Sequence, residues 1–191
     1  VALVILFLTW KRGREALVSK LYRDAMPMKE FLGVWNKTTE RVTGTAVFMT
    51  SNPGVVPTAF LHNLKHNHVV HERVVLMKVN TEDVPRVPDA QRVEIEKLGK
   101  GFHSVIAHYG FMERPDIPRL LEICRTHGIA FDLMDTTFFL GRETLIPGSR
   151  SELSWWQAQL FIWMQGSALS ATRFFRIPPN RVVEMGAQIE I

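Results

Sequence analysis

Four of the seven histidines of this 191-residue chain lie within ten residues, at His62, His66, His68 and His71. His62 and His66 are four residues apart, so on a helix they share a face, and this spacing suits two ligands of a metal ion. A third ligand would still be needed, for which Glu72 or a carboxylate distant in the sequence is a candidate. Exposed polar residues on a helix and its following loop explain the same pattern, and we favour that interpretation. Because histidine titrates near neutral pH, the cluster is also a hypothetical sensor of acidity.

Residues 51–57 (SNPGVVP) are a second candidate site, because they join an expected strand to an expected helix. At such a junction the N–H groups of the first helical turn can bind an anion. A plain tight turn accounts for the same residues, and we favour it. Residues 99–101 (GKG) look like part of a phosphate-binding loop. The Walker pattern, however, requires more glycines, a Ser or Thr after the lysine and a helix directly afterwards, whereas a strand is expected here.

The carboxylates and the single cysteine form no catalytic pattern. Asp132, Asp135 and Glu143 have no histidine or serine placed with them by sequence, and no serine-hydrolase, zinc-protease or paired-cysteine motif occurs. Cys124 falls on the expected apolar side of a helix, which indicates core packing, and one cysteine excludes a disulfide framework. The sequence therefore assigns no catalytic, cofactor-binding or metal-binding residue, implies no cofactor, and predicts that the protein is not an enzyme.

The first ten residues, VALVILFLTW, carry no charge and are followed at once by Lys11, Arg12 and Arg14. Ten helical residues rise about 15 Å, whereas a bilayer core is about 30 Å thick, so the segment is too short to span a membrane. It also lacks the charged beginning of a signal peptide. We interpret residues 1–10 as the cytoplasmic end of the last transmembrane helix, with Trp10 at the interface. A buried first strand or helix of a soluble domain is the alternative.

A basic segment follows this apolar one. Residues 11–29 contain six basic and two acidic residues, so their net charge of +4 equals that of the whole chain and the remainder is neutral. The anionic inner leaflet of a membrane attracts such a segment, although a solvated helix face has the same composition. Nucleic acid is not expected as a partner, because the rest of the chain is electrically balanced and its aromatic residues are not interleaved with basic ones.

Residues 11–41 are expected to form juxtamembrane helices and a linker. An apolar stripe runs along residues 15–35 at helical spacing, and Pro27 divides it into two helices. The compact cytoplasmic domain then occupies residues 42–191. The apolar content of 46% and the charged content of 22% are ordinary for a globular protein, so this domain can bury a substantial core.

Within residues 42–191 the pattern predicts an α/β or α+β fold, with helices packed on a mixed β-sheet. The first three expected elements make a right-handed parallel β-α-β unit, and they are a strand at 44–49, a helix at 57–67 and a buried strand at 73–79. The later expected elements are a hairpin of 92–98 and 102–109, a helix at 117–127, a strand at 136–140, a longest helix at 151–173 that a Ser149–Glu152 capping box begins, and one or two strands over 181–191.

The expected helix at 151–173 is dense in aromatic residues, with Trp155, Trp156, Phe161 and Trp163. Adjacent positions point to different faces of a helix, so both faces are partly apolar. One face is expected to pack on the sheet, which leaves the other for a second subunit or for a membrane-embedded portion. On this basis we predict a homodimer.

Four long segments carry a resemblance that covers essentially the whole chain, and they are GTAVFMTSNPGVVPTAFLHNLKHNHVVHERVVLMKV (44–79), GFHSVIAHYGFMERPDIP (101–118), FDLMDTTFFLGRETLIP (131–147) and FFRIPPNRVVEMGAQIEI (174–191). They resemble the C-terminal part of the Kup family of potassium transporters, which are bacterial relatives of the plant potassium transporters. At the N-terminal edge, the last transmembrane helix of that family also runs into a basic stretch.

The resemblance implies a protein of the bacterial plasma (inner) membrane that takes up potassium, coupled to protons. The residues that handle potassium and protons in the family lie in membrane helices outside this chain, so no transport residue carries over. The chain is then a cytoplasmic regulatory and assembly domain, whose partners are its own transmembrane domain, the inner leaflet through the basic segment, and a second copy.

The alternative is a ligand-sensing module of the same transporter that binds a nucleotide or another anion. Some Gram-positive relatives are associated with cyclic di-AMP, but no nucleotide-contact motif matches particular residues here.

Overall fold

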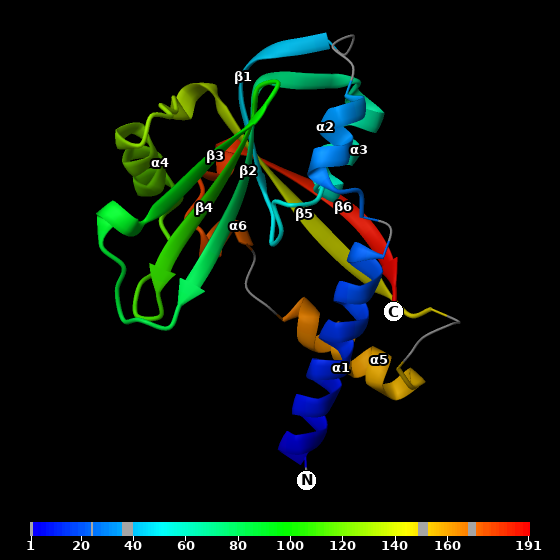
Figure 1. The fold of residues 1–191 in the computed structure, drawn as a ribbon. Coiled ribbons are helices and arrows are strands. Elements are labelled where there is room, and N and C mark those ends of the chain that lie inside the picture. The colour runs from blue at the N-terminus through cyan, green and yellow to red at the C-terminus, as the bar shows by residue number, and fades with distance from the viewer. Residues whose placement is uncertain (1, 24, 36–39, 149–152, 168–170) are drawn as a thin grey trace. The chain divides into compact units, whose positions relative to one another are not determined.

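The computed structural model describes residues 2–23, 25–35, 40–148, 153–167 and 171–191 (Figure 1). The chain divides into two compact units. Unit 1 comprises Val1–Ala25, Arg142–Leu169 and Gly186–Ile191, and unit 2 comprises Met26–Gly141 and Ser170–Met185.

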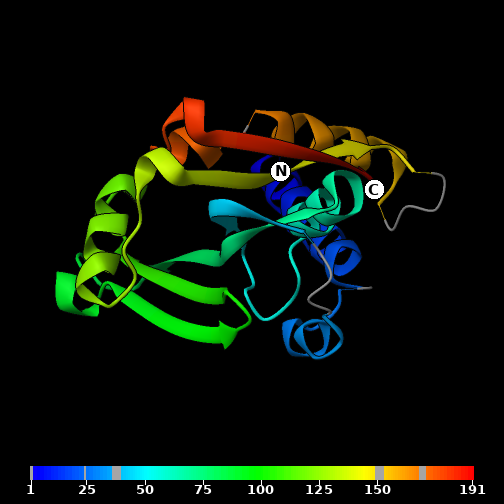
Figure 2. The ribbon, with the colours of Figure 1, turned by 90° about the horizontal axis from the view of Figure 1, so that it is seen from above.

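A six-stranded mixed sheet has the strand order β3-β4-β2-β1-β5-β6. Its strands are β1 (Glu40–Met49), β2 (Val69–Glu82), β3 (Val93–Gly99), β4 (Phe102–Gly110), β5 (Thr136–Ile146) and β6 (Val182–Glu190). β1 runs parallel to β2 and β5, β2 runs parallel to β4, and β3 pairs with β4 in the antiparallel sense. β5 and β6 lie side by side in both ribbon views (Figures 1 and 2). The mixed α/β architecture predicted from the sequence is therefore confirmed.

The central strands β1 and β2 are buried on both faces over residues 46–48 and 74–77, as the continuous apolar sequences of these stretches require. Side chains alternate between the faces, so Phe48 and Leu76 belong to one core cluster while Val47 and Val75 belong to another. Helices α2 (Met28–Val34) and α3 (Thr58–Asn67) cover the first face, and α4 (Ile117–Thr126) covers the second (Figure 1). The buried residues of α4 include Leu120 and Cys124.

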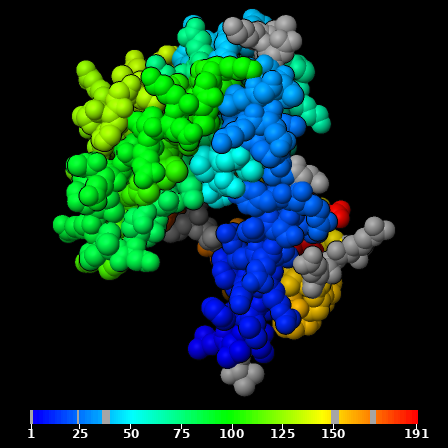
Figure 3. Space-filling view, viewed as in Figure 1, coloured from blue at the N-terminus to red at the C-terminus, as the bar shows by residue number. Residues whose placement is uncertain are grey.

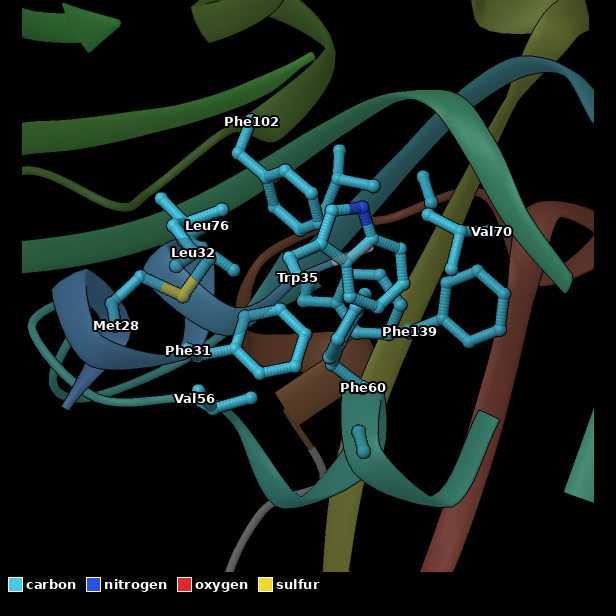
Figure 4. Close-up of a cluster of buried hydrophobic side chains, with 14 residues drawn as sticks. Met28, Phe31, Leu32, Trp35, Val56, Phe60, Val70, Leu76, Phe102 and Phe139 are labelled. Atoms are coloured by element: carbon cyan, nitrogen blue, oxygen red, sulfur yellow. The ribbon is translucent and has the colours of Figure 1, made fainter. Parts of the chain in front are cut away.

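Aromatic rings dominate the first face of the sheet (Figure 4). Phe31 of α2 meets Phe60 of α3 edge-on at 5.5 Å between ring centroids. Trp35 follows α2 and lies edge-on to Phe102 at 5.9 Å. Such contacts stabilise by about 1 kcal/mol each beyond the area that they bury. They join α2 to the core of unit 2, so the second half of the apolar stripe at 15–35 packs on the domain that follows it.

Unit 1 is built around α1 (Ala2–Tyr22) and α5 (Trp155–Gly166), whose side chains lie against one another (Figure 3). Gly13 of α1 and Phe161 of α5 approach so closely that a Cβ atom on Gly13 would lie 2.3 Å from the ring of Phe161. The ring of Trp10 lies 5.5 Å from that of Phe161. Phe161 is fully buried and also clusters with Leu17 and Ile191. A residue without a side chain at position 13 is therefore what allows this close packing.

Most expected elements are confirmed. Pro27 lies between α1 and α2, and the parallel β1-α3-β2 unit forms as expected. The hairpin of β3 and β4 turns through Gly99 and Gly101, whose φ angles of 92° and 83° are readily accessible only to glycine. One strand, β6, replaces the one or two expected near the C-terminus.

The prediction of one longest helix over residues 151–173 is wrong. α5 has 12 residues and α1 has 21, and a separate short helix, α6 (Ala171–Phe174), follows α5. The N–H of Ser154 donates to the side-chain oxygen of Gln157 at 3.2 Å, so the helix begins there, and it ends at Gly166, a residue that disfavours helix. The capping box expected at Ser149 and Glu152 lies outside the described residues.

None of the helices in the described part of the chain combines the length and the apolar character needed to cross a bilayer. Residues 2–10 form the first part of α1, which continues without a break through the basic residues that follow. Their assignment as the end of a transmembrane helix stays a prediction.

The contact between Gly13 and Phe161 yields a stability prediction. Replacing Gly13→Ala overpacks a fully buried ring and should destabilise unit 1 by about 2 kcal/mol. The control is Gly33→Ala in α2, where a Cβ atom would meet nothing within 4 Å. This control should stabilise by up to about 1 kcal/mol through helix propensity.

Guanidinium unfolding followed by tryptophan fluorescence measures both effects, because Trp35 lies in unit 2 with Gly33, while the other four tryptophans lie in unit 1 with Gly13. Equal midpoints for the two variants would show that the packing of Gly13 on Phe161 does not constrain position 13.

Candidate functional site

The four histidines of the cluster lie on a helix, at the C-terminal end of that helix and on the following strand. His62 and His66 lie on α3 with ring centroids 5.9 Å apart, whereas His68 ends that helix in a left-handed conformation and His71 lies on β2. In the part of the chain that the structure describes, no three or more His, Cys, Asp or Glu residues are grouped to hold a metal ion. Burial lowers the pKa of His71 below its ordinary value, while Asp135 acts in the opposite direction. His71 therefore takes up its proton at a lower pH than a free histidine does.

Several backbone donors of the strand–helix junction at 51–57 are in use within the turn and its surroundings. The N–H of Gly54 donates to Asn52 Oδ1 at 2.9 Å, and the N–H of Val56 donates to the carbonyl oxygen of Met26 at 3.0 Å. The carbonyl oxygen of Gly54 accepts from the N–H of Met28 at 2.9 Å. These bonds attach the segment before α2 to the junction, which supports the tight-turn interpretation over the anion site.

Lys100 has a structural role in the hairpin turn. Its Nζ donates to the carbonyl oxygens of Leu32 and Trp35 at 2.5 and 3.0 Å, and it therefore caps the C-terminal end of α2. The guanidinium of Arg41 donates to the carbonyl oxygen of Lys100 at 2.7 Å. Lys100 thus ties α2 to the hairpin turn of the sheet. This structural role differs from that of a phosphate-binding loop.

Asp132 and Cys124 also have structural surroundings. Asp132 caps a short 3-10 turn by accepting from the N–H of Met134 at 2.8 Å, and Asp135 lies beside Gly44. Glu143 belongs to unit 1, whereas the other two belong to unit 2. Burial raises the pKa of the Cys124 thiol to about 12, so it is not poised as a nucleophile.

The polar centre that the sequence did not reveal is built around Arg92, which is 6% exposed. Its guanidinium donates to both oxygens of Glu113, from Nη2 to Oε1 at 2.7 Å and from Nη1 to Oε2 at 2.9 Å. It also donates to the carbonyl oxygens of Val87 and His108, at 2.5 and 3.2 Å. The guanidinium carbon lies 4.6 Å from the ring centroid of Tyr109. This fork geometry needs an arginine, because lysine offers no planar pair of donors.

Glu113 completes the network from the other side. Its Oε2 accepts from the N–H groups of Gly110 and Val87 at 2.7 and 3.0 Å. Mainly because Arg92 donates to it, the pKa of Glu113 is lowered to about 2, and the same pairing raises the pKa of Arg92. Burial raises the pKa of Tyr109. The pair thus fixes the loop between β2 and β3 onto the end of β4.

A small hollow of about 170 Å³ lies beside this pair, and it is lined by Arg92, Tyr109, Glu113, Arg114, Asp116, Arg119, Ile123 and Arg176. Two of its arginines also face carboxylates, since Arg119 lies 3.2 Å from Asp89 and Arg176 lies 3.4 Å from Asp116. Four guanidinium groups against two lining carboxylates make the hollow basic, and its volume suits a small anion. No sequence signal indicated this hollow, because its four arginines follow no motif spacing.

A larger and more open hollow of about 750 Å³ adjoins the same loop. Its polar lining includes Glu82, Asp83, Glu94 and His108, and His108 Nδ1 lies 2.6 Å from Glu82 Oε1. The second ring nitrogen of His108 lies 3.6 Å from Glu94. His108 therefore lies between two carboxylates.

Fold and site together define an α/β domain whose polar groups brace loops, without a catalytic constellation among the described residues. The family model described as "K+ potassium transporter C-terminal domain" matches residues 43–191. The chain belongs to that family.

Curated relatives match at high identity along the whole chain. It is 53% identical to "Probable potassium transport system protein Kup" of Myxococcus xanthus, over 100% of this chain and 29% of the relative. It is 48% identical to "Probable potassium transport system protein Kup 1" of Paramagnetospirillum magneticum and 51% identical to "Probable potassium transport system protein Kup 3" of Dechloromonas aromatica, over 99% and 98% of this chain and 30% of each relative. The chain therefore spans less than a third of their length. These relatives are named as transport proteins and not as enzymes. No solved structure is significantly similar to this chain.

The lowered pKa of Glu113 gives a pH prediction. A carboxylate whose pKa is lower in the folded state stabilises it above the unfolded pKa, and loses that effect as pH falls through the folded pKa. With values of 4.5 and about 2, this loss should occur as pH falls from about 5 toward 2. Glu113→Gln should destabilise the chain by about 2 kcal/mol at pH 7, and the difference from the parent should shrink below pH 4.

Urea unfolding at several pH values measures this difference. Glu122→Gln is the matched control, because it removes the same charge from an exposed position of α4. If Glu113→Gln and Glu122→Gln showed the same dependence on pH, the ion pair with Arg92 would not contribute to stability.

Proposed function

We propose that this chain is the cytoplasmic regulatory and assembly domain of a Kup-type transporter that takes up potassium, coupled to protons, across the bacterial inner membrane. The observation that carries the proposal is the family match over residues 43–191, together with relatives named for potassium transport of which the chain spans less than a third. Membership of a C-terminal domain family supports a transport apparatus outside this chain. The bracing role of the polar groups in unit 2 supports a regulatory role over a chemical one.

The proposed partners are the protein's own transmembrane domain and the lipid of the inner leaflet. Leu3 and Phe7 in the first half of α1 are 81% and 66% exposed, which is costly in water and suits a hydrocarbon environment. Lys11, Arg12 and Arg14 follow on the same helix, where they would meet anionic headgroups. This order of apolar and basic residues supports a cytoplasmic position for the basic side. The homodimer stays a prediction from the sequence.

Potassium uptake by the full-length protein tests the proposal. In cells that lack their other potassium transporters, deletion of residues 42–191 should lower uptake several-fold or abolish its regulation, because the domain supports assembly and control. The amount of protein in the membrane fraction must be measured in parallel. Unchanged uptake and unchanged regulation at equal amounts of protein would reduce the domain to a structural appendage.

A ligand-sensing module of the same transporter is the second candidate function, and the basic hollow beside Arg92 favours it. An anion that binds only the folded state stabilises it by about 2.7 kcal/mol at a hundredfold excess over Kd. Inorganic phosphate and pyrophosphate are suitable probes, at ionic strength matched with chloride. Either should raise the thermal midpoint of the parent chain.

Arg176→Gln should reduce this anion-dependent shift, since Arg176 lines the hollow, whereas Arg125→Gln on the exposed side of α4 should not. The comparison matters because phosphate also stabilises proteins without binding, through exclusion from their surface. An equal shift in both variants would exclude an anion site at the hollow.

A further inference from the structure

We propose that α5 is an interfacial helix, whose tryptophan face enters the headgroup region of a lipid bilayer beside α1. This inference rests on the proposed function, because it requires a membrane at the level of α1.

The composition of α5 is unusual for a surface helix. None of its 12 residues is charged, and its sequence is WWQAQLFIWMQG. Trp155, Trp156 and Trp163 are 77%, 48% and 68% exposed. At about 100° per residue these three side chains, with Gln159 between them, fall within an arc of roughly 100°. Ala158 and Phe161, which are buried, lie on the opposite side. One face of α5 is therefore packed, and the other presents three large apolar rings to the surroundings.

The buried face of α5 fixes the helix at a particular level of α1. Phe161 packs against Gly13 and Trp10. These two positions flank the point at which α1 changes character, since residues 2–10 are uncharged and Lys11, Arg12 and Arg14 follow. α5 crosses α1 rather than running along it (Figures 1 and 2). A helix that crosses a membrane-directed helix at its apolar–basic boundary lies along the membrane surface.

The chemistry of the exposed face fits lipid at that depth. Tryptophan concentrates at membrane interfaces, because its ring is large and apolar while its indole N–H seeks a polar partner. Interfacial helices commonly carry basic residues as well. Here α5 has none, and the exposed Lys11, Arg12 and Arg14 of the contacting helix supply them. The two helices together offer the apolar rings and the positive charge that an anionic membrane surface attracts.

The size of the face argues against a second copy of the chain as its occupant. A 12-residue helix is about 18 Å long and about 10 Å wide, so its exposed face covers on the order of 200 Å². A stable interface buries about 800 Å² on each partner. A dimer contact through α5 alone would therefore be too small, whereas membrane insertion of three tryptophans needs no larger surface.

The test uses the full-length transporter in nanodiscs that contain anionic lipid, with cysteines outside residues 1–191 removed. Cys124 stays in place, because it is fully buried and its thiol pKa is raised to about 12, so it does not compete for the label. An environment-sensitive fluorophore is attached at Trp163→Cys or, as the matched control, at Met134→Cys. Met134 is a 73% exposed apolar residue of unit 2.

The label at position 163 should be quenched several-fold more by lipid that carries a spin label near its headgroup than the label at position 134. The label at position 134 should instead be quenched more strongly by iodide in water. If iodide quenched both labels equally, the tryptophan face would lie in water and the inference would be overturned. Protection of position 163 from both quenchers would overturn it too, and a disulfide between two copies of the unlabelled Trp163→Cys variant would identify the second copy as the occupant.

Potassium uptake by the unlabelled parent protein distinguishes failure of the proposed function from failure of the proposed location of α5. Absence of uptake would count against the proposed function, whereas the quenching pattern alone decides the location of α5.

Discussion

Burial of β1 and β2 on both faces is the constraint from which most of unit 2 follows. Ala46, Val47 and Phe48 alternate between the faces and are all less than 2% exposed, so each face needs its own cover. The aromatic layer of α2 and α3 covers one face and α4 covers the other. Each strand carries apolar residues on both faces, so a register shift of one residue would keep both faces apolar. It would nevertheless disrupt the ring packing that is specific to one face. The helices are therefore needed to bury the apolar side chains of the sheet on both of its faces.

Polar groups then fix the loops that this layered core leaves unsupported. The Arg92–Glu113 pair attaches the segment between β2 and β3 to the end of β4, and Lys100 attaches the hairpin turn to the end of α2. A buried guanidinium is tolerated only when its donors are paired, and here it has two carboxylate oxygens and two backbone carbonyls. Further arginines surround a small hollow beside this pair, so the Arg92–Glu113 pair and the proposed anion site share residues.

Unit 1 differs from unit 2 in how its core is packed and in how much apolar surface it exposes. Its core depends on one close helix–helix contact, at Gly13 and Phe161, and much of its remaining apolar surface is exposed on α1 and α5. A soluble domain rarely leaves so many large apolar side chains uncovered. In a transporter of the family to which this chain belongs, a neighbouring membrane would remove that cost. The proposed roles of α1 and α5 are thus two consequences of the same uncovered surface.

The sequence by itself determined the elements whose signals are local. A strand pattern closed by a turn indicated β1, a nearly continuous apolar run indicated the buried strand β2, Pro27 separated two helices, and glycines marked the hairpin. The limits of α5 were misjudged, because the Ser154–Gln157 cap competed with a similar pattern five residues earlier. Only the tertiary structure paired Arg92 with Glu113, 21 residues apart, and placed Gly13 against Phe161. Such contacts depend on how strands and helices pack in three dimensions. Neither residue spacing nor composition reveals that packing.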